Sequence, residues 1–267
     1  MEQIFTMPVI CIVNQKGGVG KTTTTAALAQ GLSEAKKRVL LVDWDSQASL
    51  TISMGVNPDD LERTVYDVLT STIRGDGRCT MEEVSVPTEL PGVDLAPANI
   101  ELSQAQLDLV SAFTRELMLR DMLQPVRQEY DYILIDCLPS LGLLTINALA
   151  ASDCVLIPMQ ADFLAMKGLA QLLTTILRVQ ERLTPRLEIL GILFTMTNVR
   201  TLHTREVIEV TKRAFGERIR VFDITIPVSV RFKEAPAAGM TILTYAPTSD
   251  GAEAYRQIAA EVMHETR

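Results

Sequence analysis

Apolar residues gather in five short runs along the chain that show no alternation with polar residues. Strands of this kind have both faces covered, which is typical of a parallel sheet that lies between two layers of helices. The sequence therefore predicts buried strands at these positions. They are residues 9–13, 39–42, 132–135, 154–158 and 189–194.

The segments between these runs have the spacing of helices. Because strand and helix alternate, the pattern predicts an α/β fold, doubly wound, in which a mostly parallel sheet is flanked by helices and connected by right-handed crossovers. We expect a single domain over residues 1–267, without a linker or an internal repeat. The expected helices lie near residues 21–36, 112–129, 141–151, 165–183 and 203–215.

Two further segments complete this pattern. Residues 250–266 are predicted to form a last helix with Asp250 as its N-cap. Its apolar positions make one stripe at helical spacing, formed by Tyr255, Ile258, Ala259, Val262 and Met263. Residues 71–92 contain three glycines and two prolines, and we expect them to form an irregular surface excursion.

The composition is that of a globular protein with a large core. Hydrophobic residues make up 47% of the 267 positions and charged residues 22%, which excludes wholesale disorder. The net charge of −8 argues against constitutive binding to nucleic acid. The charge is uneven, since residues 200–233 hold eight basic and four acidic side chains. This window predicts either a local basic face or an ordinary solvated helix surface.

The sequence shows neither a secretory signal nor a membrane span. The N-terminal stretch has an early acidic residue, Glu2, and no basic region, and no apolar run reaches the roughly 18 residues that a bilayer requires. Four cysteines lie far apart and form no CxxC pair, so buried free thiols in a reducing compartment are expected. These features predict a soluble, cytoplasmic protein.

The strongest chemical signal is a glycine-rich turn between the first strand and the first helix. Its sequence is Lys16-Gly17-Gly18-Val19-Gly20-Lys21-Thr22-Thr23. Glycines let the backbone bend around an anion with its N–H groups pointing inward, and the helix that follows adds the positive end of its dipole. We predict that residues 17–23 bind a nucleotide, with Lys21 on the β- and γ-phosphates and the Thr22 hydroxyl on Mg²⁺.

This run resembles the deviant Walker A motif of the ParA/MinD group. The resemblance implies a deviant P-loop NTPase fold that binds ATP and Mg²⁺ and forms a homodimer around the nucleotide. It also implies that Lys16 crosses to the nucleotide of the other subunit, where a cation offsets charge at the γ-phosphate as an arginine finger does. Lys16 and Lys21 are therefore predicted to be catalytic, and a solvated loop charge is the alternative for Lys16.

Two acidic residues end the second predicted strand, at the sheet edge where doubly wound folds bind their ligands. They are Asp43 and Asp45, in a run that resembles the D-x-D-P-Q element of the same family with Ser46 in place of proline. The resemblance assigns Asp45 the orientation or activation of the attacking water and Asp43 a place in the Mg²⁺ shell. A capping role in the next helix is the open alternative for Asp43.

A third acidic residue, Asp136, ends the run at 132–135. Apolar residues followed by aspartate form the Walker B pattern, in which the acid holds Mg²⁺ through water. The next residues resemble the family's D-x-P-P-S-L-G element from Pro139 to Gly142, whereas Leu138 replaces the first proline. We expect this loop to sense the γ-phosphate.

The C-terminal half supplies candidates for contacts to the base and to DNA. Asn198 follows the fifth run and offers an amide that suits an adenine edge, with a turn residue as the alternative. The resemblance adds Pro227 to the base contacts and places valine, Val228, where the family usually has arginine. It also implies sequence-independent DNA binding through basic residues of this half, for which the candidates are Arg200, Arg231, Lys212 and Arg213.

The resemblance covers about residues 7–262 and implies a partition or positioning ATPase. In such proteins ATP closes the dimer, the dimer binds DNA on the nucleoid, and a ParB-type adaptor stimulates hydrolysis and release. A membrane-associated ATPase of the MinD kind is the alternative, which calls for a basic amphipathic C-terminal helix. An iron protein like that of nitrogenase is disfavoured because no second cysteine suits Cys137. The intact motif residues argue against an inactive nucleotide site.

Overall fold

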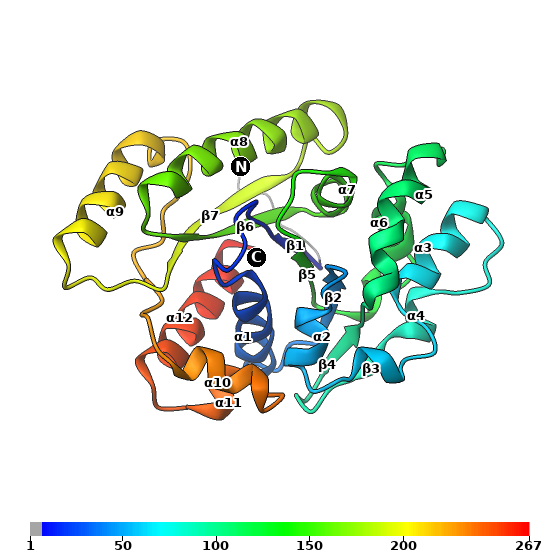
Figure 1. Cartoon of the computed structure of the whole chain (residues 1–267), viewed down its shortest axis with the longest axis horizontal. Coiled ribbons are helices and arrows are strands. Elements are labelled where there is room, and N and C mark those ends of the chain that lie inside the picture. The colour runs from blue at the N-terminus through cyan, green and yellow to red at the C-terminus, as the bar shows by residue number, and fades with distance from the viewer. Residues whose placement is uncertain (1–6, 267) are drawn as a thin grey trace.

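The computed structural model describes residues 7–266 as one seven-stranded sheet between two layers of helices (Figure 1). The strand order is β3-β4-β2-β5-β1-β6-β7, and every neighbouring pair is parallel except β3 with β4. The strands are β1 (Val9–Ile12), β2 (Val39–Trp44), β3 (Val86–Pro87), β4 (Val93–Ala96), β5 (Tyr132–Cys137), β6 (Cys154–Gln160) and β7 (Glu188–Thr195). Residues 1–6, on which part of the signal-peptide prediction rests, lie outside the described residues.

The central strands are buried on both faces. Every residue of β1, β2 and β5 is buried, which explains why their sequences are continuous apolar runs. The five predicted strands and the doubly wound α/β class are confirmed. The pattern does not reveal β3 and β4, because β3 has two residues and β4 has four, one of them Asp94.

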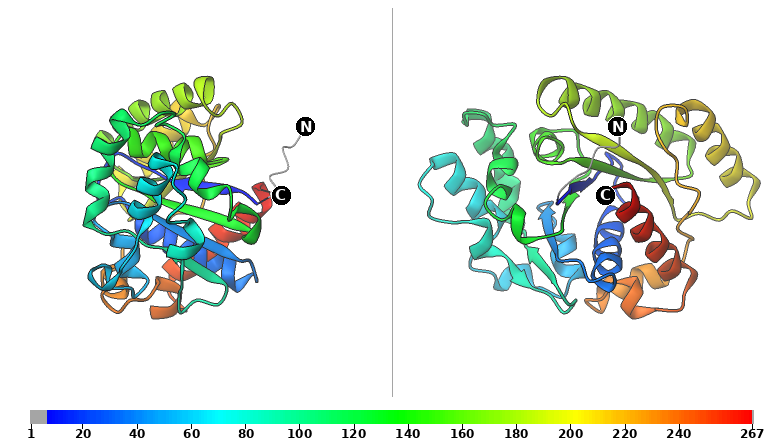
Figure 2. Two further views of the ribbon diagram at one scale, coloured as in Figure 1. Left: turned by 90° about the vertical axis from the view of Figure 1, so that its right-hand side faces the viewer. Right: turned by 180° about the vertical axis from the view of Figure 1, so that it is seen from behind.

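The helices cover the sheet on both sides, as the opposite views in Figures 1 and 2 show. Helices α3 to α9 contribute to one apolar core, and α1, α2, α11 and α12 contribute to the other. The longer helices are α1 (Lys21–Glu34), α3 (Val65–Arg74), α7 (Leu143–Ala151), α8 (Phe163–Arg182), α9 (Leu202–Phe215) and α12 (Asp250–Glu265). The shorter ones are α2 (Ser49–Ser53), α4 (Met81–Val84), α5 (Ala105–Ser111), α6 (Met118–Leu123), α10 (Arg231–Ala237) and α11 (Ile242–Tyr245).

Two predicted segments differ from the structure. The single helix predicted over 112–129 is wrong, since Thr114 adopts a left-handed φ of 50° and helix resumes only as α6. A left-handed threonine cannot continue an α-helix. Residues 71–92 are more than a surface excursion, because they include α4 and the edge strand β3 and bury Met81 and Val84 in the core.

All four cysteines are buried free thiols, as the sequence predicts. Among residues 7–266, no helix combines the length and the apolar character that a bilayer span requires.

The C-terminal helix α12 packs along α1, the helix that follows the glycine-rich loop. Tyr255, Ile258, Ala259 and Val262 of the predicted stripe are buried, and the Tyr255 hydroxyl lies 3.0 Å from Thr24 Oγ1. The two backbones approach closely at Gly31, where a methyl group would lie 2.6 Å from the Ala259 Cβ atom. At the other end of α12, Thr266 Oγ1 lies 3.0 Å from the hydroxyl of Tyr132, the first residue of β5.

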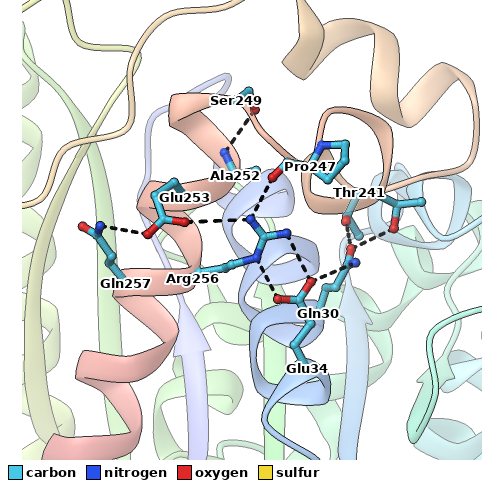
Figure 3. Close-up of polar contacts among 10 residues, drawn as sticks. Gln30, Glu34, Thr241, Pro247, Ser249, Ala252, Glu253, Arg256 and Gln257 are labelled. Carbon is cyan, nitrogen blue, oxygen red and sulfur yellow. Dashed lines mark hydrogen bonds and ion pairs between the residues drawn. The ribbon is translucent and has the colours of Figure 1, made fainter.

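Polar contacts join α12 to the end of α1 at the solvent-exposed side of this interface (Figure 3). Arg256 Nε donates to Glu34 at 2.8 Å, and its Nη1 donates to the Pro247 carbonyl at 2.8 Å. Ser249, and not the predicted Asp250, is the N-cap of α12, since its Oγ accepts from the Ala252 N–H. Asp250 is the first residue of the helix, where its negative charge interacts favourably with the positive end of the helix dipole.

We expect Gly31→Ala to destabilise the protein by about 1–3 kcal/mol, because the added methyl forces α1 and α12 apart. Removing the opposing methyl with Ala259→Gly costs roughly 1 kcal/mol alone through helix propensity. The double variant should recover most of the loss, since it moves one methyl across the interface. Urea unfolding of all four proteins measures this coupling, and simple additivity of the two losses would contradict the close approach.

Candidate nucleotide-binding site

The site lies at the carboxyl ends of the three central strands. Ile12 of β1 and Asp43 of β2 are both paired in register with Asp136 of β5, so these strands end side by side. The glycine-rich loop leaves β1 at this point and leads into α1. In doubly wound folds, ligands bind in the crevice at this edge.

The loop from Asn14 to Gly20 is preorganised by its own hydrogen bonds. Asn14 is buried and donates from Nδ2 to the Pro158 carbonyl at 2.8 Å, while its Oδ1 accepts from the Lys16 N–H at 3.0 Å. Gly18 and Gly20 have φ values of 70° and 84°, which side-chain-bearing residues rarely adopt. A Cβ atom at Gly17 or Gly18 would meet no atom within 4 Å, so open space adjoins the loop. No pattern in the sequence indicates that Asn14 supports this loop.

Lys21 is the first residue of α1, and its side chain is buried beneath the loop. It is 7% exposed, and its Nζ donates to the Lys16 carbonyl at 3.3 Å. Burial lowers the pKa of Lys21, while the nearby charges of Asp136 and Asp45 act in the opposite direction. An anionic ligand beside this ammonium would further favour its charged form.

Thr22 and Asp136 form a direct pair at the foot of the loop. The Thr22 hydroxyl donates to Asp136 Oδ2 at 2.6 Å, and Asp136 is 1% exposed. Burial raises the pKa of Asp136 well above its usual range, and the charge of Asp43 raises it further. A hydroxyl beside a buried carboxylate is the donor set that Mg²⁺ takes when it keeps several waters, so these residues fit a magnesium ion.

Asp43 and Asp45 have different environments, although only one residue separates them. Asp43 is fully buried, and its Oδ2 accepts from both the N–H and the hydroxyl of Thr51 at 2.8 Å. Burial raises the pKa of Asp43 to about 6. This geometry favours the capping alternative for Asp43, since Thr51 lies in α2. Asp45 is half-buried, and its Oδ1 accepts from the Gln47 N–H at 3.1 Å.

A hollow beside α1 is the candidate site for the base. Its volume is about 100 Å³, and Pro227 is among its lining residues. Asn198 is not among them: it is exposed, and its Oδ1 accepts from the Arg200 N–H, which is the turn alternative. Gly20 and Thr23 of the predicted loop also line it, and so does Ile226. The sequence does not predict the other lining residues as base contacts, and these are Thr195, Met196, Val228, Ser229, Phe232, Lys233 and Tyr255.

Comparison with known proteins assigns the chain to a family. A family model described as an AAA domain matches residues 7–189. The sporulation initiation inhibitor protein Soj of Bacillus subtilis is 46% identical over 254 residues, which cover 95% of this chain and 97% of Soj. The chromosome partitioning protein ParA of Myxococcus xanthus is 43% identical over 96% of this chain and 87% of its own length. The chain belongs to the ParA/Soj family.

Solved structures agree with this fold. Cobyrinic acid a,c-diamide synthase from Mycobacterium smegmatis, solved with ADP and magnesium, has a TM-score of 0.83 and 36% sequence identity, covering 96% of this chain and 94% of its own. The same protein has also been solved with an ATP analogue and magnesium. Its name denotes a different function from those of Soj and ParA, so the comparisons establish the family rather than the reaction.

The four basic residues predicted to bind DNA in this member of the ParA/Soj family differ in whether they are already paired with an acidic side chain. Arg200, Arg213 and Arg231 are exposed, and within residues 7–266 none of them has an acidic partner within 4 Å. Lys212 instead forms an ion pair with Asp223 at 2.8 Å. The structure therefore leaves three of the four candidates available to an anionic ligand and places the fourth in an internal pair.

Lys21→Ala should abolish nucleotide binding, because it removes the buried cation at the centre of the loop. Lys37→Ala, the same change beyond the other end of α1, is the matched control and should bind as the unaltered protein does. Titration with a fluorescent ATP analogue in the presence of magnesium measures both. Unchanged affinity in Lys21→Ala would show that the loop is not the phosphate site.

Proposed function

We propose that this protein is an ATPase of the partition type, which pairs around ATP and binds DNA until hydrolysis releases it. The observation that carries the proposal is the pair of lysines in one loop. Lys21 is buried at the base of the loop, whereas the side chain of Lys16 is 39% exposed at its rim. The inner cation serves the nucleotide of its own subunit, and the outer one serves the nucleotide of a second subunit.

ATP and Mg²⁺ are the proposed ligands. The structures of cobyrinic acid a,c-diamide synthase hold ADP or an ATP analogue together with magnesium. In this chain the loop N–H groups, Thr22 and Asp136 are groups that suit these ligands. Bound magnesium supplies positive charge that offsets the charge developing on the phosphates. Thr22 and Asp136 hold it, the loop N–H groups bind the phosphates, and Asp45 orients the water that attacks the γ-phosphate.

The exposed apolar side chains support pairing through the nucleotide edge of the sheet. Several of them stand in the segments that follow the carboxyl ends of β4, β6 and β7, and these are Ile100 (65% exposed), Phe163 (71%), Met196 (43%), Val199 (51%) and Leu202 (64%). Large apolar side chains gathered on one edge are typical of a surface that a partner covers. A second copy placed over this edge also encloses the nucleotide.

DNA binding is proposed to require two subunits. A single chain has a net charge of −8, and a dimer doubles the number of basic side chains that one surface can present to DNA. Contacts through Arg200, Arg213 and Arg231 to phosphates carry no sequence information. A ParB-type adaptor that stimulates hydrolysis completes the proposed cycle. The name of the Myxococcus xanthus relative, a chromosome partitioning protein, supports the partition role.

The packing of α12 disfavours the membrane-associated alternative. Binding of a helix to a bilayer surface requires an apolar face that is free to enter the lipid. The apolar face of α12 is buried against α1, with Tyr255, Ile258 and Val262 at 1% exposure or less. Release of this face would open the core beside the nucleotide loop.

Asp45→Ala should lower the ATPase rate by at least about 100-fold, because the attacking water loses the group that orients it. The protein should then remain as an ATP-bound dimer on DNA. Light scattering with ATP and magnesium, together with DNA binding in ATP, ADP and no nucleotide, measures this. A monomer in ATP would count against the proposed function.

Arg200→Glu should weaken DNA binding and leave ATP turnover unchanged. The slope of log affinity against log salt should fall by about one for each phosphate that Arg200 no longer neutralises. Arg78→Glu makes the same charge change at an exposed side chain in the segment between α3 and α4 and should bind DNA normally. Loss of both DNA binding and turnover in Arg200→Glu would mean that Arg200 serves the fold or the nucleotide.

A further inference from the structure

The loop lysine Lys16 is held inside its own subunit. Its Nζ lies 2.9 Å from Asp162 Oδ2 and 3.3 Å from Gln160 Oε1. Both acceptors belong to the β6–α8 corner, residues 160–163, where β6 ends and α8 begins. The ammonium therefore points along the sheet edge of its own chain in the unpaired protein.

The same corner and helix hold the rest of the loop. Gln160 Nε2 donates to the Gly18 carbonyl at 3.2 Å, and Gln15 Nε2 donates to Gln171 Oε1 of α8 at 3.0 Å. The absence of a side chain at Gly168 of α8 leaves space for the Gln15 side chain, because a Cβ atom there would lie 2.7 Å from the Gln15 amide nitrogen. The inward position of Lys16 is thus part of a set of contacts between the loop and α8.

Pairing around ATP requires a different position of Lys16. Asp162 and Gln160 of the same chain already accept from the Lys16 ammonium, and the proposed contact with a nucleotide in the other subunit requires the ammonium to leave them. Each dimer must therefore break two Lys16–Asp162 pairs, one in each subunit. The proposed trans contact and the observed intramolecular ones therefore compete for the position of one ammonium group.

We propose that Asp162 is a positioning residue that restrains Lys16 in the monomer and thereby weakens pairing. This inference rests on the proposed function, because it assumes that Lys16 acts in the other subunit. The two side chains are 39% and 40% exposed, and exposed ion pairs change an equilibrium by between about 1.4-fold and fivefold. Two pairs break in each dimer, so the restraint weakens pairing by about two- to 25-fold.

Asp162→Asn tests the restraint with little effect on the fold. Asp162 directly precedes α8, where asparagine is tolerated as well as aspartate, so the variant removes the charge and keeps the shape of the side chain. The control is Asp223→Asn, which makes the same change in the Lys212–Asp223 pair of 2.8 Å. Asp162→Glu keeps the charge and should retain most of the restraint.

The measurement is the protein concentration at which half of the chains are paired, by light scattering in ATP and magnesium. All variants carry Asp45→Ala, so that ATP is not consumed. Asp162→Asn should lower this concentration by about two- to 25-fold, whereas Asp223→Asn and Asp162→Glu should change it by less than twofold. Circular dichroism before each titration confirms that the variants are folded.

An unchanged or higher midpoint in Asp162→Asn would overturn the inference, since Asp162 would then be neutral or a contact of the dimer itself. That result would leave the proposed function intact, provided that the Asp45→Ala parent pairs. If the parent remains monomeric in ATP at every concentration, the proposed function fails, and the inference fails with it.

Discussion

The nucleotide site depends on opposite charges that are buried together where the central strands end. Lys21, Asp43 and Asp136 lie at the middle of the sheet with almost no exposure. Removing such groups from water is costly unless their charges are balanced and their hydrogen bonds are made. Thr22, Thr25 and Thr51 supply hydroxyl donors to these carboxylates. This polar centre is possible only because the surrounding strands bury continuous apolar runs on both faces.

The same charges tie ligand binding to the stability of the fold. Burial acts against the charged forms of both Lys21 and Asp136, as their pKa directions show. A phosphate beside the ammonium and a cation beside the carboxylate each favour the charged form. A ligand that binds only the folded protein stabilises it by mass action. The folded state should therefore gain stability from nucleotide and magnesium together more than from either alone.

Much of this structure follows from the sequence, and the exceptions have physical causes. The five buried strands and the loop residues 16–23 are local patterns, so a single chain displays them. β4 and β3 are too short for a period to appear, and the break at Thr114 depends on one backbone dihedral angle. The lining of the base hollow joins residues from Gly20 to Tyr255, which only the fold brings together. The partner of Lys16 likewise lies 146 positions away, at Asp162.

The contact between Thr266 and Tyr132 shows at which edge of the sheet α12 ends. Tyr132 begins β5, so the end of α12 lies at the amino edge of the sheet, opposite the nucleotide loop. β1 also begins at that edge, with Val9 in register with Ile133. Val9 and Thr266 therefore both lie at the edge of the sheet opposite the surface proposed for pairing. A fluorescent reporter inserted after β4, β6 or β7 would obstruct the proposed pairing, whereas the amino edge of the sheet lies on the other side of the molecule.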